Sequence, residues 1–191
     1  MRSYTVLLVA SAGLALSAPT TNLAERQSRC FLIGNEVLPK EVQDVVTSIQ
    51  SRITCNPSIK TLSNVPDVSS GSVSFSSINF ASSPQTALQF ALDKFATKAP
   101  LASNDLVTFQ RQLDVYLATE AGIRSVAGGL GLKPVKFFLQ FQVSRIQTAQ
   151  GNPPTAAGLQ VDHLLEKVLK NAPRESKALQ DQVRSLAKVL A

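Results

Sequence analysis

The sequence predicts an α+β fold: mainly a bundle of five or six helices, with a small N-terminal β part of two or three strands tied by one disulfide. Three observations support this class. Residues 56–83 are rich in Ser, Asn, Pro and Gly with β-branched residues between them, which favours short strands and turns. From residue 82 onward, apolar side chains recur at helical spacing. Two cysteines, Cys30 and Cys55, flank the first predicted helix and can form the disulfide.

The N-terminus has the layout of a secretory signal peptide. Arg2 supplies a positive charge, residues 4–16 form an apolar run, and small residues follow that suit cleavage after Ser17 or Ala18. The run is shorter than the roughly 20 residues that span a bilayer, and an uncleaved anchor is the alternative. We therefore expect the protein to be secreted and extracellular. We expect a signal peptide at residues 1–18, a disordered segment at residues 19–29 and a single secreted α+β domain at residues 30–191.

If the protein is exported, its two cysteines indicate a disulfide. An even pair in an oxidising compartment most simply forms one disulfide, here between Cys30 and Cys55. On the chain-entropy model such a link stabilises the fold by about 3.5 kcal/mol. Two free buried thiols are the alternative. A zinc site would need more ligands than two cysteines and the distant His163, so we expect no metal.

The N-terminal part should contain a strand and a helix. Residues 30–33 are short and apolar, which favours a strand. Pro39 can open a helix, because its missing N–H costs nothing in the first turn. Apolar residues then recur at helical spacing until about Arg52, and Cys55 returns the chain to the strand.

Two further strands are predicted at 58–66 and 72–80, joined through residues 67–71. In the second strand, the alternation of apolar residues changes parity near Ser76 and Ser77. Such a change indicates a β-bulge at this point.

Five helices should follow. Pro100 stops the first of them, and Gly128 and Gly129 stop the second. The third starts near Pro134 and has apolar residues on all sides, which is typical of a central, buried helix. The predicted starts are Ser82 or Ser83, Ser103 or Asn104, Pro134, residue 157 and residue 174, and the last two helices should end near residues 171 and 190.

The formal net charge is +6, and the excess lies in the C-terminal third: ten of the 19 basic residues but four of the 13 acidic ones lie from residue 121 onward. Outside a cell, a basic surface attracts anionic wall polymers, anionic membrane surfaces or acidic secreted proteins. Solvated helix faces that aid solubility are the simpler interpretation. We do not expect nucleic acid as a partner of an exported chain, and we expect a monomer.

The single histidine is the natural candidate for acid–base catalysis. On the helix predicted at 157–171, the apolar residues fall within one arc, and His163 lies nearly opposite them with Glu166 and Lys167. It should face solvent, so a Ser–His–Asp or Cys–His device would have no base. Asp162, His163 and Glu166 diverge too much to hold a metal. We assign no catalytic residue and no cofactor.

One polar pair lies on an apolar stripe. Glu120 and Arg124 are spaced i,i+4 and extend the stripe that carries Leu113 and Leu117. We expect a partly buried ion pair that locks this helix against the central one. In the functional alternative, Glu120 is an acid in a pocket, with Arg124 and Tyr116 as its partners.

A second candidate surface is apolar. Phe137 and Phe141 lie one turn apart on the back of the central helix, near Lys133 and Lys136. Left uncovered, they would form a patch that docks on a lipid surface or a partner protein. Burial beneath the last two helices is the simpler interpretation. A large dry cavity lined by these rings and Phe138 would instead indicate lipid binding.

Three stretches also resemble a known family as a set. They are CFLIGNEVLPKEV from Cys30, LATEAGIRSV from Leu117 and VSRIQTAQGNPPTAAGLQVDHL from Val143. Over about residues 30–186 the chain resembles an uncharacterised family of small secreted fungal proteins, a domain of unknown function. The resemblance implies export from a fungal cell and a disulfide between Cys30 and Cys55. It implies no established activity or ligand.

These observations favour a secreted, non-enzymatic protein that binds at a cell wall or another extracellular surface. One alternative is a small hydrolase or lyase built on carboxylates such as Glu120, since glycosidases need just two acids. The chain has no tryptophan and two tyrosines, which is unfavourable for a sugar site. The other alternative is a helical protein that binds lipid in an apolar cavity.

Overall fold

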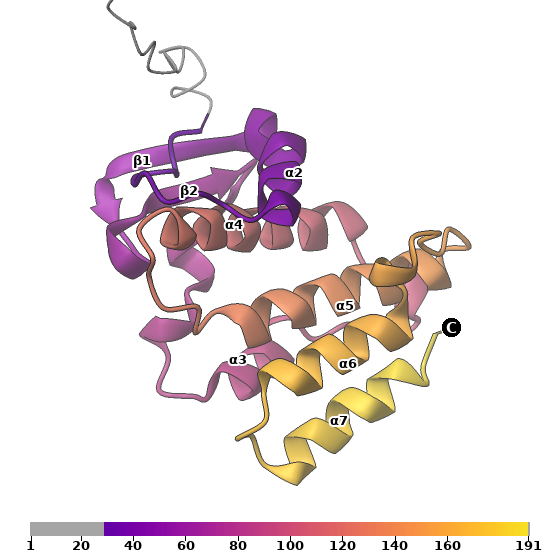
Figure 1. Cartoon of the computed structure of the whole chain (residues 1–191). Coiled ribbons are helices and arrows are strands. Elements are labelled where there is room, and N and C mark those ends of the chain that lie inside the picture. Colours follow the sequence, from indigo (N-terminus) through magenta and orange to yellow (C-terminus); the bar gives the residue numbers. More distant parts are fainter. Residues whose placement is uncertain (1–28, 191) are drawn as a thin grey trace, which may run out of the picture.

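A small antiparallel sheet occupies the N-terminal part of the chain and helices form the rest (Figure 1). The computed structural model describes residues 29–190, which hold six α-helices and three strands. The predicted α+β, mainly helical class is confirmed. The predicted signal peptide and all but the last residue of the predicted segment 19–29 lie outside the described residues. In chain order the elements are α2 (Lys40–Ile49), β1 (Ile53–Lys60), β2 (Pro66–Ser70), β3 (Val73–Ser74), α3 (Ala87–Lys94), α4 (Leu106–Arg124), α5 (Lys133–Ala149), α6 (Val161–Asn171) and α7 (Lys177–Ala187).

The sheet has the order β1-β2-β3 with both pairings antiparallel. Residues 67–71, predicted as a connection, instead supply most of the central strand β2. That prediction is wrong because Asp67 is buried and has distant partners: its carboxylate accepts from the N–H and the hydroxyl of Ser76, at 2.8 and 2.6 Å. The turn comes one step later, where Gly71 has a φ of 57° between β2 and β3.

Two other predicted β features are wrong. Residues 30–33 contain a turn and no strand, because the backbone N–H groups of Ile33 and of the next residue, Gly34, donate to Oγ of Ser125 beyond α4 rather than to a sheet partner. The change of parity near Ser76 and Ser77 reflects a short 3₁₀ turn rather than a bulge. The sheet is therefore smaller and ends earlier than the apolar pattern indicates.

The predicted disulfide between Cys30 and Cys55 is confirmed. It links the turn before α2 to strand β1. Helix α2 is thus held at both ends, and it packs against α4.

Helix α5 lies at the centre of the helical part. It packs against α3, α4 and α6, while α4 also packs against α2 and the sheet. Figure 1 shows α4, α5, α6 and α7 side by side in chain order, each antiparallel to the one before. The prediction of a central, buried helix is confirmed, since fully buried side chains lie on several sides of α5. They are Val135, Phe138, Leu139, Phe141, Gln142 and Ile146.

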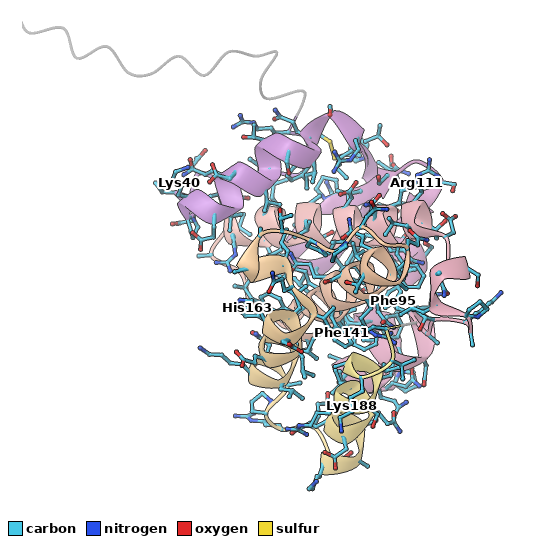
Figure 2. The ribbon with its side chains drawn as sticks, turned by 90° about the vertical axis from the view of Figure 1, so that its right-hand side faces the viewer. Lys40, Phe95, Arg111, Phe141, His163 and Lys188 are labelled. Atoms are coloured by element: carbon cyan, nitrogen blue, oxygen red, sulfur yellow. A yellow bond between two sulfur atoms is a disulfide. The ribbon has the colours of Figure 1, made fainter. Side chains whose placement is uncertain are left out.

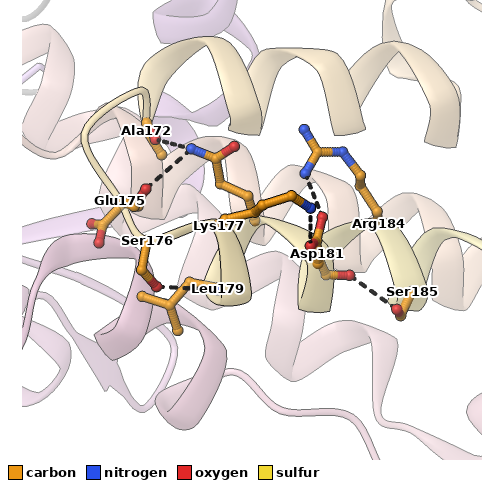
Figure 3. A network of polar contacts seen from close by, with 9 residues as sticks. Ala172, Glu175, Ser176, Lys177, Leu179, Asp181, Arg184 and Ser185 are labelled. Atoms are coloured by element: carbon orange, nitrogen blue, oxygen red, sulfur yellow. Dashed lines mark hydrogen bonds and ion pairs between the residues drawn. The ribbon is translucent and has the colours of Figure 1, made fainter.

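Helix starts differ from the predictions where the capping residue lies further along the chain. α3 begins at Ala87 with Thr86 as its N-cap, not near Ser83. α4 begins after Asp105, whose carboxylate accepts two backbone N–H groups of the first turn. α7 begins after Ser176, whose hydroxyl accepts a backbone N–H of the first turn (Figure 3). In each case a side-chain oxygen satisfies N–H groups that have no partner inside the helix.

Two side chains attach the C-terminal helices to the rest. Arg145 on α5 is 1% exposed and donates to the carbonyls of Leu186 and Val189, from Nε at 2.8 Å and from Nη2 at 2.9 Å. Glu175, in the turn between α6 and α7, accepts the backbone N–H of Leu88 in the first turn of α3. The end of α7 is therefore fixed to the central helix.

Candidate functional site

A groove runs along the seam between the antiparallel helices α4 and α5. It consists of two adjoining cavities of about 390 and about 560 Å³, which share Val45, Leu117, Gln140 and Leu164 as lining residues. Cavities of this size accommodate small organic ligands. Helix α2 forms one rim, and α6 with the loop before it forms the other.

One face of each central helix supplies the floor. Its lining residues recur at intervals of three and four, as expected for one side of a helix. Along α5 the floor extends from Lys133 to Gln147, a rise of about 21 Å. The floor residues are Gln110, Leu113, Asp114, Leu117, Glu120 and Arg124 from α4, and Lys133, Lys136, Phe137, Gln140, Val143, Ser144 and Gln147 from α5.

An ionic triad lies on the floor of the first cavity. Glu120 is 4% exposed, and its Oε1 accepts from Nε and Nη2 of Arg124 at 3.0 and 2.8 Å. Its Oε2 lies 2.8 Å from Nζ of Lys136, which comes from α5. Both carboxylate oxygens are therefore occupied, and the triad joins the two floor helices at this end of the groove.

Two cations in the triad share one carboxylate. Burial alone would raise the pKa of Glu120, but its interactions with Lys136 and Arg124 outweigh burial and lower it, so Glu120 is ionised at neutral pH. Burial lowers the pKa of Lys136; the attraction of Glu120 offsets part of this effect, and repulsion from Arg124 and Lys133 opposes that attraction. This end of the groove therefore keeps an excess of positive charge.

The structure brings Glu120 and Arg124 together but places Tyr116 elsewhere. Tyr116 is fully buried, and its hydroxyl donates to the carbonyl of Ile78 at 2.7 Å. Burial raises the pKa of this hydroxyl. Tyr116 thus faces the β part of the molecule, and Lys136 rather than Tyr116 is the further partner of Glu120.

The candidate apolar patch of Phe137 and Phe141 does not form, because Phe141, labelled in Figure 2, is fully buried. Its ring packs beside Phe138, with centroids 6.0 Å apart, and Cζ of Arg145 lies 5.5 Å from its centroid. Phe137 is half-buried and lines the first cavity, with Nζ of Lys136 at 3.8 Å from its ring centroid. Neither cavity of the groove is lined by Phe138 or Phe141, so the phenylalanine-lined cavity that would indicate lipid binding is not formed here.

The single histidine lies on α6, where Figure 2 shows it away from the buried Phe141. His163 is partly exposed, lines neither cavity of the groove, and makes no hydrogen bond or ion pair with residues 29–190. Within these residues, no group of three or more His, Cys, Asp or Glu side chains is placed to hold a metal ion.

Two polar atoms on the groove floor lack partners. Oε1 of Gln140 and Oγ of Ser144 are buried, and neither makes a hydrogen bond in the described part of the chain. Ser144 is 2% exposed. The two residues lie one turn apart on α5; Gln140 lines both cavities and Ser144 lines the second. A buried polar group without a partner is unfavourable. The sequence signal that indicates this pair is weak, because α5 carries other polar residues close by, among them Gln142, Arg145 and Gln147.

The far end of the groove is electrically balanced. Arg52 donates from Nε and Nη2 to the two carboxylate oxygens of Asp114, at 2.9 and 3.0 Å. Oγ of Ser70 also donates to Asp114, at 3.3 Å. The groove therefore has one basic end and one neutral end, with apolar side chains between them.

A separate cavity of about 520 Å³ lies between α3 and α7. Its charged lining residues, as far as the structure describes the chain, are Asp93 and Asp181. This cavity differs from the groove in the sign of its charge, which makes it a useful reference site.

The fold and the groove define a small, disulfide-linked α+β protein with a partly buried cationic cleft. A family model described as a domain of unknown function (DUF7143) matches residues 32–191, and the chain belongs to this family. No curated protein and no solved structure matches the chain. No helix in residues 29–190 has both the length and the apolar character needed to cross a membrane.

Proposed function

We propose that this protein is an extracellular, non-enzymatic binding protein that holds an elongated amphipathic small molecule in the α4–α5 groove. The observation that carries this proposal is the change in charge and polarity from one end of the groove floor to the other. A basic end at Lys136 passes into apolar walls that include Leu117 and Leu164, and then into the neutral Arg52–Asp114 pair. An elongated molecule with one polar end matches this order.

The extracellular location is supported by two features. The N-terminal residues have the signal-peptide layout, and Cys30 and Cys55 form a disulfide, which persists in oxidising compartments.

The triad argues against a hydrolase built on Glu120. A general acid must carry its proton near neutral pH, which requires a raised pKa. The two cations instead lower the pKa of Glu120 and occupy both of its oxygens. Among residues 29–190, Glu41 on the rim helix α2 is the other carboxylate that lines this cavity, and it is exposed. Glu120 is therefore suited to balancing charge rather than to transferring protons.

Attachment to an anionic wall, membrane surface or acidic secreted partner is a second candidate function. It is favoured by exposed basic side chains on and between the last two helices. The test is retention of the full secreted chain on an anionic polysaccharide at rising salt, since screening should release it. Retention unchanged in high salt would exclude this mode. The side chains are Lys170, Arg174, Lys177, Arg184 and Lys188.

The groove proposal is tested with Nile red, an uncharged apolar fluorophore, and the full secreted chain. Val45 is half-buried and lines both cavities, so Val45→Trp should fill the groove and weaken binding by about tenfold or more. The matched control is Val107→Trp, because Val107 is 50% exposed on α4 and lines neither cavity. Absence of binding to the wild type, or equal weakening by both substitutions, would overturn the proposal.

A further inference from the structure

We propose that the ligand of the groove is an aliphatic carboxylic acid that carries a hydroxyl group at some distance from its carboxylate. The carboxylate would lie at the basic end, near Arg124 and Lys136, and the hydroxyl would lie beside Gln140 and Ser144. This ligand class depends on the proposed function, because it names what the α4–α5 groove holds.

The positive charge at the basic end of the groove favours a ligand with one anionic group. Arg124 uses Nε and Nη2 for Glu120, which leaves Nη1 without a partner among the described residues. Lys136 is 8% exposed, so its charge is poorly solvated and only partly compensated by the shared carboxylate. Lys133 and Lys167, both half-buried, line the same cavity. A bound carboxylate would balance this charge and accept hydrogen bonds from two adjacent donors.

The polar atoms in the middle of the groove favour a ligand with a hydrogen-bonding group at this position. Oε1 of Gln140 is a buried acceptor, and Oγ of Ser144 can both donate and accept. Both atoms are covered in this structure, so their side chains must turn toward the groove to meet a ligand. A ligand hydroxyl would then donate to Gln140 and accept from Ser144, which would satisfy both atoms at once. An alkyl chain without a polar group would leave them unpaired.

The distance between the two polar regions sets the length of the ligand. Lys136 and Ser144 are eight residues apart on α5, a rise of about 12 Å. Leu117, Leu164 and Phe137 line the cavity walls between them and would contact the methylene chain. The Arg52–Asp114 pair beyond is internally neutral and does not call for a second charge on the ligand.

The test compares three probes by calorimetry on the full secreted chain: decanoate, decanol and ω-hydroxydecanoate. Decanoate should bind about tenfold more tightly than decanol, and ω-hydroxydecanoate should bind several-fold more tightly than decanoate. Lys136→Met should abolish the preference for decanoate over decanol. Ser144→Ala should abolish the gain from the hydroxyl, so that ω-hydroxydecanoate and decanoate bind this variant equally tightly. Lys170→Met, an exposed lysine of α6 that lines neither cavity, is the control and should alter neither preference.

The outcomes separate this inference from the proposed function. If Nile red binds in the groove but decanoate and decanol bind equally tightly, the inference that the ligand carries a carboxylate is wrong, and the groove proposal stands. If decanoate is preferred but the hydroxyl adds nothing, the role given to Gln140 and Ser144 is wrong. If neither Nile red nor any of the three probes binds, both proposals are overturned.

Discussion

Lys136 on α5 lies 2.8 Å from the Glu120 carboxylate on α4, and this ion pair joins the two floor helices at the basic end of the groove. Arg124 binds the same carboxylate from its own helix, so Glu120 is held between two cations. One buried side chain therefore links the stability of the α4–α5 seam to the charge of the groove.

Replacing Glu120 should destabilise the fold. In Glu120→Gln the buried cations Arg124 and Lys136 lose their shared carboxylate, which should lower the free energy of unfolding by about 2 to 3 kcal/mol. Urea unfolding measures this loss. The matched control is Asp44→Asn, which removes the exposed partner of Lys40 and should leave the midpoint almost unchanged. Equal midpoints for wild type and Glu120→Gln would show that the triad does not hold the helices together.

The contribution of Glu120 should depend on pH. Its pKa is lowered in the folded state, so its stabilisation is complete above the ordinary carboxyl value of 4.5 and is lost as the pH falls through the folded value. The difference in unfolding free energy between wild type and Glu120→Gln should be constant near neutral pH and shrink in acid. Urea unfolding at a series of pH values measures it. A difference that widens on acidification would contradict the lowered pKa.

Removing the disulfide should destabilise the N-terminal part. The double substitution of Cys30 and Cys55 by alanine should lower the free energy of unfolding by about 3 kcal/mol, because the unfolded chain regains the entropy of an open loop. Thermal and urea unfolding of the variant and of the reduced wild type should agree. A variant as stable as the oxidised protein would show that the link is not a stabilising element.

Arg145 should hold the end of α7 in place. In Arg145→Met the carbonyls of Leu186 and Val189 lose a buried donor, at a cost of about 2 kcal/mol. Amide hydrogen exchange should become faster at Lys188 and Val189. Arg184→Met is the control, since Arg184 is exposed and pairs with Asp181 on its own helix (Figure 3). Equal exchange in both variants would contradict the anchoring role.

Local patterns sufficed to predict the helices, apart from where several of them start, but not the sheet. α5 could be predicted as central because its apolar residues lie on all sides, a property of the sequence alone. Strand β2 could not, since Asp67, Ser69 and Ser70 within it and Gly71 directly after it are residues typical of turns. Asp67 is stable in a buried strand because of Ser76, nine residues away, and such a partner is decided by the folded chain.

The same limit applies to the site. Glu120 and Arg124 could be paired from their spacing on one helix. Lys136 could not be assigned to them, because the contact depends on how α5 packs against α4. The partnerless atoms of Gln140 and Ser144 likewise become apparent once both floor helices and their rims are in place.

The most direct test of the central claim, that the α4–α5 groove binds ligand, is a titration of the labelled protein with decanoate followed by NMR. Chemical shifts should move at Leu117, Gln140, Ser144 and Leu164 on the groove, and should stay constant at Ala178 and Gln182 in the acidic cavity between α3 and α7. Shifts confined to Ala178 and Gln182, or no shifts at saturating decanoate, would contradict the account.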